Sequence, residues 1–182
     1  MGRMIVDATT SLDGFWADAR GRSVLPAEER GASGLPESFE QACGALVMSG
    51  ACLDAGAHAG GIERAHDSRV PVFVVDERRP PRTRSEAAPA PVHFVESYPA
   101  AFRAARAAAG DKAVLVLGEA RSLEAALGTG EADEILLRVV SRTVGAGAPL
   151  FTADIPVENY YVARMETTTV AVHMHLERRL DG

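Results

Sequence analysis

This sequence has no long apolar run and very little cysteine. No apolar run of the 182-residue chain approaches the ~18 residues that a membrane span needs. The N-terminal MGRMIVDATT runs directly into a strand-like pattern, with no apolar leader followed by a cleavage site. We therefore expect a cytoplasmic protein with no membrane partner. Cys43 and Cys52 are too few for a disulfide framework or a zinc site, and we interpret them as small buried thiols.

Lysine is nearly absent, and negative charge exceeds positive charge. Lys112 is the one lysine among 19 basic residues, and with the many alanines and glycines this indicates high-GC coding rather than a functional choice. The net charge of −6 argues against a general nucleic-acid surface, so we expect no nucleic-acid partner.

What the chain does have is a regular alternation of short apolar runs with helical patterns. With 47% hydrophobic residues and no internal repeat, residues 1–182 are expected to form one domain. Strands are predicted over residues 4–9, 44–50, 71–77, 91–96, 112–118 and 133–140, helices over 36–43, 97–110 and 120–130, and loops over 21–38 and 78–91. The tail, residues 157–180, alternates in two long runs that are typical of an antiparallel hairpin. The pattern predicts a mostly parallel α/β sheet, covered on both faces and finished by antiparallel strands.

Parallel sheets bind ligands at the carboxyl ends of their strands, and four unusual loops follow such ends here. Three of them are Ser11–Gly14, Ser49–Ala51 and Gly118–Ala120, and the fourth is the small-residue segment of VVSRTVGAGAPLF, residues 139–151. Gly145 and Gly147 in that segment have two explanations. They allow either a tight connection, because glycine takes positive φ without strain, or the close approach of a flat or anionic group to the main chain.

Four stretches resemble the dihydrofolate-reductase-like domains related to the reductase half of the riboflavin-biosynthesis deaminase/reductase. They are ATTSLDGFWA, GALVMSGACLD, AVLVLGEARSLEAAL and DEILLRVVSRTVGAGAPLF. With the tail, they cover nearly the whole chain. The resemblance implies a three-layer α/β/α fold, a homodimer, and NADPH or NADH as cofactor for reducing a small planar heterocycle. It also implies that Gly145 and Gly147 let chain segments cross closely near the nicotinamide.

The resemblance also implies a set of site residues. Asp13 is the most plausible chemical carboxylate, and no metal site is implied. The substrate would meet Ser11, Trp16 and Phe151. The cofactor would meet Ala8, Ser49, Gly50, Asp76, Gly118, Glu119, Ala120 and Gly145.

Three of these positions depart from the family pattern. Gly50 stands where the family has an arginine that pairs with the cofactor phosphates, and Cys52 stands at a threonine. Asp76 follows a strand where the family often has Ser or Thr. It suits a ribose hydroxyl better than a 2′-phosphate, although Arg78 and Arg79 could restore positive charge. Glu119 replaces a glycine at the loop that would cradle the pyrophosphate.

Several of these residues have a plainer explanation. Glu119 is either a favourable first-turn acid, a source of repulsion against a pyrophosphate, or a built-in substitute for the phosphate. Asp13 beside Gly14 needs no chemistry beyond forming a turn. Trp16 would stack on a heterocycle or pack under the next loop. His173 and His175 share one strand face, as metal ligands can, but a solvated face is favoured because no third ligand is evident.

Two functions remain open from the sequence. The first is an NAD(P)H-dependent reductase of a pterin- or pyrimidine-like heterocycle, in which the protein orients the ring and excludes water. The second is a reductase-fold protein that has lost nicotinamide binding, and serves as a small-ligand binder or a cofactor-independent enzyme. Family resemblance favours the first, and the three altered positions favour the second.

Overall fold

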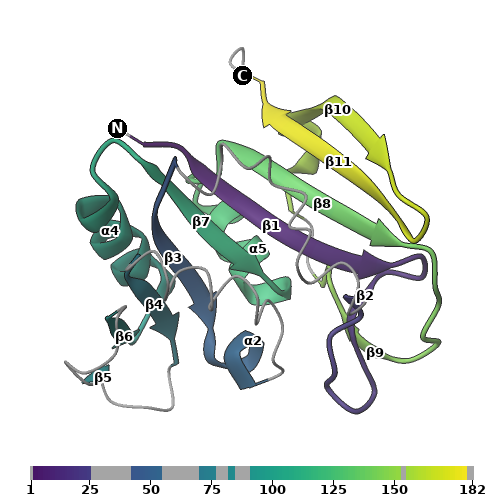
Figure 1. The fold of residues 1–182 in the computed structure, drawn as a ribbon, viewed down its shortest axis with the longest axis horizontal. Helices are drawn as coiled ribbons and strands as arrows, with labels where there is room; N and C mark the ends of the chain where they lie inside the picture. Colours follow the sequence, from purple (N-terminus) through teal and green to yellow (C-terminus); the bar gives the residue numbers. More distant parts are fainter. Residues whose placement is uncertain are drawn as a thin grey trace.

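A computed structural model describes residues 2–25, 42–54, 70–76, 82–84, 91–152 and 155–179. Most of the helix predicted over residues 36–43 and both Arg78 and Arg79 lie outside these described residues. Within them, one nine-stranded sheet has the order β10-β11-β8-β1-β7-β3-β4-β6-β5 (Figure 1). Its strands are β1 (Met4–Ser11), β3 (Cys43–Ser49), β4 (Val72–Val75), β5 (Arg82–Arg84), β6 (Val92–Val95), β7 (Ala113–Gly118), β8 (Glu134–Val140), β10 (Tyr160–Thr167) and β11 (Ala171–Arg178).

The centre of the sheet is parallel and its C-terminal end is antiparallel. Strand β1 pairs in parallel with both β7 and β8, while β3 pairs in parallel with β7 and β4, and β4 with β6. The hairpin β10–β11 adds to β8 in the antiparallel direction, and β5 adds to β6 in the same way. This arrangement confirms the predicted mostly parallel sheet with antiparallel C-terminal strands.

Helices cover both faces of the sheet, as a three-layer α/β/α fold requires. On one face, α4 (Tyr98–Ala109) buries Ala101, Phe102, Ala105 and Ala109, and α5 (Ala120–Gly128) buries Leu123, Ala126 and Leu127. These side chains recur every three or four positions, so they form one apolar stripe on each helix. They pack on Met4, Val6, Val47, Val114 and Val116 of the sheet. On the other face, Cys52 and Leu53 of the short helix α2 (Gly50–Asp54) pack with Ile5, Met48, Leu115 and Leu117.

Helix α4 has the boundaries that its terminal residues predict. Ser97 lies at the N-cap position with extended backbone, but its side chain makes no capping hydrogen bond, so Pro99 and tertiary packing set the start. Gly110 ends the helix with φ of +61°, the left-handed conformation that favours glycine.

A second, two-stranded sheet was not predicted and lies beside the carboxyl end of β1. It joins β2 (Phe15–Asp18) to β9 (Gly147–Pro149) in antiparallel fashion. Strand β5 also falls inside a segment predicted as loop. Each of these strands has only three or four residues, which is too short for an alternating pattern to be visible. Tertiary contact forms them instead, and β2–β9 ties the loop after β1 to the loop after β8.

Candidate functional site

The carboxyl ends of β1, β3, β4 and β7 meet at one edge of the sheet. Their register shows this, because Ala8 pairs with Gly118, Val47 with Val116, and Ser49 with Val75. The segments that follow these strands contain most of the predicted site residues. They fall into three groups, which we describe in turn.

The first group lies after β3 and β4. The Ser49 hydroxyl oxygen accepts a hydrogen bond from the Cys52 backbone N–H at 3.0 Å, which fixes the start of α2. A Cβ on Gly50 would lie 2.9 Å from Asp76 Oδ2, so the backbone here presses against a buried carboxylate. The position where the family has an arginine therefore has no room for a side chain unless Asp76 moves.

The second group is centred on Glu119, which is the N-cap residue of α5. Its carboxylate accepts hydrogen bonds from the backbone N–H groups of Arg121 and Ser122, both at 3.1 Å. The Ser122 hydroxyl donates to the same carboxylate at 3.1 Å, and the Tyr98 hydroxyl of α4 donates to it at 3.2 Å. Glu119 is only 3% exposed. The carboxylate is therefore bound inside the protein by donors from two helices.

Packing within the protein explains why the residues next to Glu119 in this group have small side chains or none. A Cβ on Gly118 would lie 3.0 Å from the Asp7 carbonyl oxygen and 3.2 Å from Ala8 Cβ, so glycine is required by packing against β1. Ala120 is buried at the start of α5, and Ala8 is buried within the core beneath it. None of these three therefore needs a ligand to explain its small size.

The Cys52 thiol connects the first two groups electrostatically. Burial, and then the nearby carboxylates of Glu119 and Asp7, raise the pKa of this thiol, so it stays protonated. Burial, and then Glu119, likewise raise the pKa of the Tyr98 hydroxyl, which keeps it a hydrogen-bond donor. Neither cysteine forms a disulfide. Cys52 is buried, as predicted, but Cys43 is only half-buried, so the prediction is wrong there.

The third group joins the loop after β1 to the loop after β8. Asp13 accepts hydrogen bonds from the Ser11 hydroxyl at 2.6 Å, from the Gly145 N–H at 2.7 Å and from the Val144 N–H at 3.1 Å. The Ser11 oxygen in turn accepts the Phe15 N–H at 3.0 Å. The hydrogen bond from Ser11, and then those from Gly145 and Val144, lower the pKa of Asp13. Such an ionised carboxylate anchors two loops, and it is poorly suited to donate a proton near neutral pH.

The structure requires glycine at positions 145 and 147 for two different reasons. Gly145 has φ of +74°, and a Cβ there would meet nothing within 4 Å, so it permits a turn. A Cβ on Gly147 would lie 2.1 Å from the Ala17 carbonyl oxygen, so it permits a close crossing of β9 and β2. The tight connection thus explains Gly145, and Gly147 is explained by a close chain crossing, which the family resemblance implied, with β2 as the segment crossed.

The remaining predicted ligand contacts differ in exposure. Trp16 of β2 is half-buried and packs against the apolar clusters of both sheet faces, so it lies where the two faces meet. Phe151 follows β9 and is 43% exposed. The structure thus places these aromatic side chains near the loops of the third group, on the segments that β2 and β9 join.

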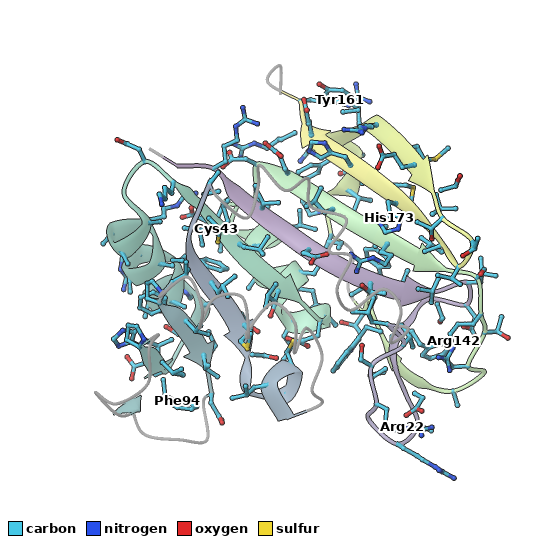
Figure 2. The ribbon with its side chains drawn as sticks, in the orientation of Figure 1. Arg22, Cys43, Phe94, Arg142, Tyr161 and His173 are labelled. Atoms are coloured by element: carbon cyan, nitrogen blue, oxygen red, sulfur yellow. The ribbon has the colours of Figure 1, made fainter. Side chains whose placement is uncertain are left out.

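Buried polar side chains of β1 and β8 near these strand ends were missed from the sequence. The Arg138 guanidinium of β8 donates to Thr9 Oγ1 at 2.8 Å and lies 4.0 Å from Asp7 Oδ1, both on β1. Farther along the same face, His175 Nε2 lies 2.9 Å from Glu134 Oε2, and His173, labelled in Figure 2, is opposite Arg138 in the register of the paired strands β11 and β8. Both histidines are half-buried, so the strand face that we predicted to be solvated is partly covered. The signal was the polar residue inside each apolar run, in IVDATT and ILLRVV.

The part of the chain that the structure describes contains neither a metal-binding cluster nor a membrane-spanning helix. No three His, Cys, Asp or Glu side chains there gather as a metal site would need. No helix there is long and apolar enough to cross a membrane.

The described residues do not fit the phosphates of a dinucleotide at the family's usual place. The donors at the start of α5 are bound to the Glu119 carboxylate, and a second buried carboxylate, Asp76, lies beside Gly50. Nicotinamide dinucleotides need free N–H groups or cations at such a position.

Comparison with known proteins identifies the fold. No protein-family model and no curated protein matches the chain. Among solved structures, a protein described as a riboflavin biosynthesis protein, from Shewanella sp. PV-4, matches with a TM-score of 0.72 and 20% identity over 97% of this chain and 99% of its own. A diaminohydroxyphosphoribosylaminopyrimidine deaminase/5-amino-6-(5-phosphoribosylamino)uracil reductase from Thermotoga maritima matches with a TM-score of 0.63 and 17% identity over 98% of this chain. RibD from Acinetobacter baumannii matches with a TM-score of 0.66 and 15% identity over 98% of this chain.

The present chain spans 57% of the Thermotoga protein and 58% of the Acinetobacter protein. The chain therefore has the dihydrofolate-reductase-like α/β fold that it shares with these three proteins.

Proposed function

We propose that this chain binds a small planar heterocycle, of the pyrimidine or pterin kind, at the carboxyl edge of its sheet, without holding a nicotinamide dinucleotide at α5. The observation that carries this proposal is the Glu119 carboxylate, which occupies the helix N–H groups that a pyrophosphate would need. The ligand class is suggested by the Thermotoga neighbour, whose name describes an aminopyrimidine deaminase and an aminouracil reductase. The protein is then a small-ligand binder or a cofactor-independent enzyme.

Trp16 gives this proposal a direct test, because it is the single tryptophan of the chain. We expect aminopyrimidines and reduced pterins to change its fluorescence saturably, since an aromatic side chain at this edge can stack on a planar ring. Free ribose is the matched probe without a planar ring, and it should leave the fluorescence unchanged. No saturable change with any heterocycle, confirmed by calorimetry, would contradict the proposal.

A second candidate is an NAD(P)H-dependent reductase of the same class of heterocycle. The likeness to a deaminase/reductase over nearly the whole chain favours it. In that case Gly50 and Asp76 offer the 2′-phosphate no cation, and a carboxylate suits the ribose hydroxyl of NADH instead. We therefore expect NADH to bind no worse than NADPH. Calorimetric titration with both decides between the candidates: heterocycle binding without dinucleotide binding supports the first, and micromolar binding of either dinucleotide supports the second.

A further inference from the structure

The Glu119 carboxylate accepts more hydrogen bonds than helix capping requires. A usual N-cap side chain satisfies one backbone N–H of the first turn. Here the two carboxylate oxygens receive both the Arg121 and the Ser122 N–H groups, and the hydroxyls of Ser122 and Tyr98 add two further donors. Four donors around two oxygens is the coordination that a bound phosphate group would be given at a helix N-terminus.

The contact with Tyr98 brings a second element into this network. Tyr98 is the first residue of α4, whereas Glu119 precedes α5, and the Tyr98 and Ser122 hydroxyls are 3.0 Å apart. The network therefore bridges the two helices that cover this face of the sheet. Because the carboxylate is buried, releasing it would leave a charge without its hydrogen bonds in a poorly solvated place.

A ligand anion would thus have to displace an anion that the chain already holds. The displaced carboxylate would stay within reach of the incoming group, where like charges repel. Gly118 gives no relief, since its lack of a side chain is used in packing against Asp7 and Ala8 of β1. The other phosphate-binding position of the family is similarly closed, because Gly50 abuts the Asp76 carboxylate.

We infer that the Glu119 carboxylate is a permanent intramolecular substitute for a ligand phosphate, and that it excludes dinucleotides and phosphorylated ligands from the N-terminus of α5. The inference deepens the proposed function, on which it rests for the idea that another ligand uses this edge. The ligand of the proposed function is then a heterocycle that places no phosphate group at the N-terminus of α5. A single side chain then determines the exclusion, and removing it should uncover an anion site.

The test asks whether an added anion restores the stability that the variant Glu119→Gly loses, and the melting temperature Tm measures that stability. We expect Tm to fall by roughly 3–8 °C, because several hydrogen bonds to a charged group are lost in a chain of this length. Inorganic pyrophosphate at millimolar concentration should restore several degrees to this variant, since a ligand bound by the folded state alone raises Tm. It should not move the Tm of the unaltered protein beyond a sodium chloride control of equal ionic strength.

Two further variants complete the experiment. Glu96→Gln removes an exposed carboxylate just before α4, so it matches the charge change and should show neither the fall nor the rescue. Glu119→Ser retains a short capping side chain, and it serves if Glu119→Gly fails to fold. Rescue of either Glu119 variant supports the inference.

Three outcomes would overturn the inference. One is a Glu119→Gly variant whose Tm equals that of the unaltered protein. Another is equal stabilisation of both proteins by pyrophosphate, and the third is a fall in Tm without rescue in either Glu119 variant, which would make Glu119 a helix cap only. None of these depends on whether a heterocycle binds, so failure here is distinguishable from failure of the proposed function in the Trp16 titration.

Discussion

At the scale of single residues, an alanine would be unfavourable at position 145 because of the backbone conformation, and at position 147 because of a steric clash. Gly145→Ala places a methyl group in open space but at a left-handed φ, which costs about 1 kcal/mol. Gly147→Ala forces a Cβ against the Ala17 carbonyl oxygen, and overpacking against backbone costs about 3 kcal/mol. We therefore expect Gly147→Ala to be the more destabilising by a clear margin in urea unfolding. Equal free energies of unfolding for the two variants would contradict the close crossing of β2 and β9.

Asp13 predicts a pH-dependent stability. Its pKa in the folded chain lies below the ordinary value of 3.8, chiefly because the Ser11 hydroxyl donates to it. A depressed pKa means that the ionised carboxylate stabilises the fold above that value, and that this contribution is lost as pH falls through the lower folded pKa. Asp13→Asn should therefore melt below the unaltered protein at pH 7, and the gap should shrink below about pH 4. Glu158→Gln, in an exposed turn, serves as control, and a gap that stays constant down to pH 2.5 would count against the anchoring role.

At the scale of elements, strands β1 and β8 are joined by a buried ion pair as well as by backbone hydrogen bonds. Arg138 lies among buried groups beside Thr9 and Asp7. Arg138→Met leaves the Asp7 carboxylate without this cation, and loss of one partner of a buried pair costs about 3–5 kcal/mol. Thr9→Val removes only one hydrogen bond and should cost about 1 kcal/mol.

The double variant Asp7→Asn with Arg138→Met measures the interaction free energy between the two side chains, apart from what each contributes alone. If the two side chains interact, the double variant should be more stable than the sum of the single effects predicts. Chemical denaturation of the four proteins measures this coupling. Strict additivity would show that Arg138 acts through other contacts of β8.

The elements also show which information the sequence carried. The strands of the large sheet and the two long helices were predictable because each contains a complete run of its own periodicity, as in AVLVLG and in the alanine stripe of α4. Strands β2 and β9 were not predictable, since their pairing depends on a contact between residues more than 120 positions apart. The same holds for the site. The sequence singled out Glu119, but its bond to Tyr98 exists only because α4 and α5 pack side by side.

At the scale of the whole molecule, the C-terminal hairpin predicts association. Strand β10 lies at one end of the sheet order, and its apolar side chains are exposed, with Met165 at 63%, Val162 at 51% and Tyr161 at 42%. Tyr161 is labelled in Figure 2. An edge strand with exposed apolar side chains is a ready interface for a second copy. We propose a homodimer formed through this hairpin, with twice the 19.2 kDa mass of one chain in light scattering at micromolar concentration.

The variant Val162→Arg tests which surface forms the dimer. Placing a charge in the middle of β10 should shift the mass toward that of a single chain, because an unpaired charge in an interface is unfavourable. Leu12→Arg adds the same charge at an exposed apolar residue in the loop after β1, and it should leave the mass unchanged. A monomeric unaltered protein, or a dimer indifferent to Val162→Arg, would remove the claim for this hairpin.

The position of β1 between β7 and β8 has a consequence for biosynthesis. Strand β1 is synthesised before both strands that flank it, because Met4 pairs with Val114 and Ile5 pairs with Glu134. Strand β1, which lies inside the sheet, therefore keeps its apolar residues uncovered until β7 and β8 have been translated. Contacts so distant in sequence make folding slow and leave the nascent chain open to aggregation. Ribosome-bound chains that end before β8 should accordingly recruit chaperones, and release from them should coincide with the synthesis of residues 134–140.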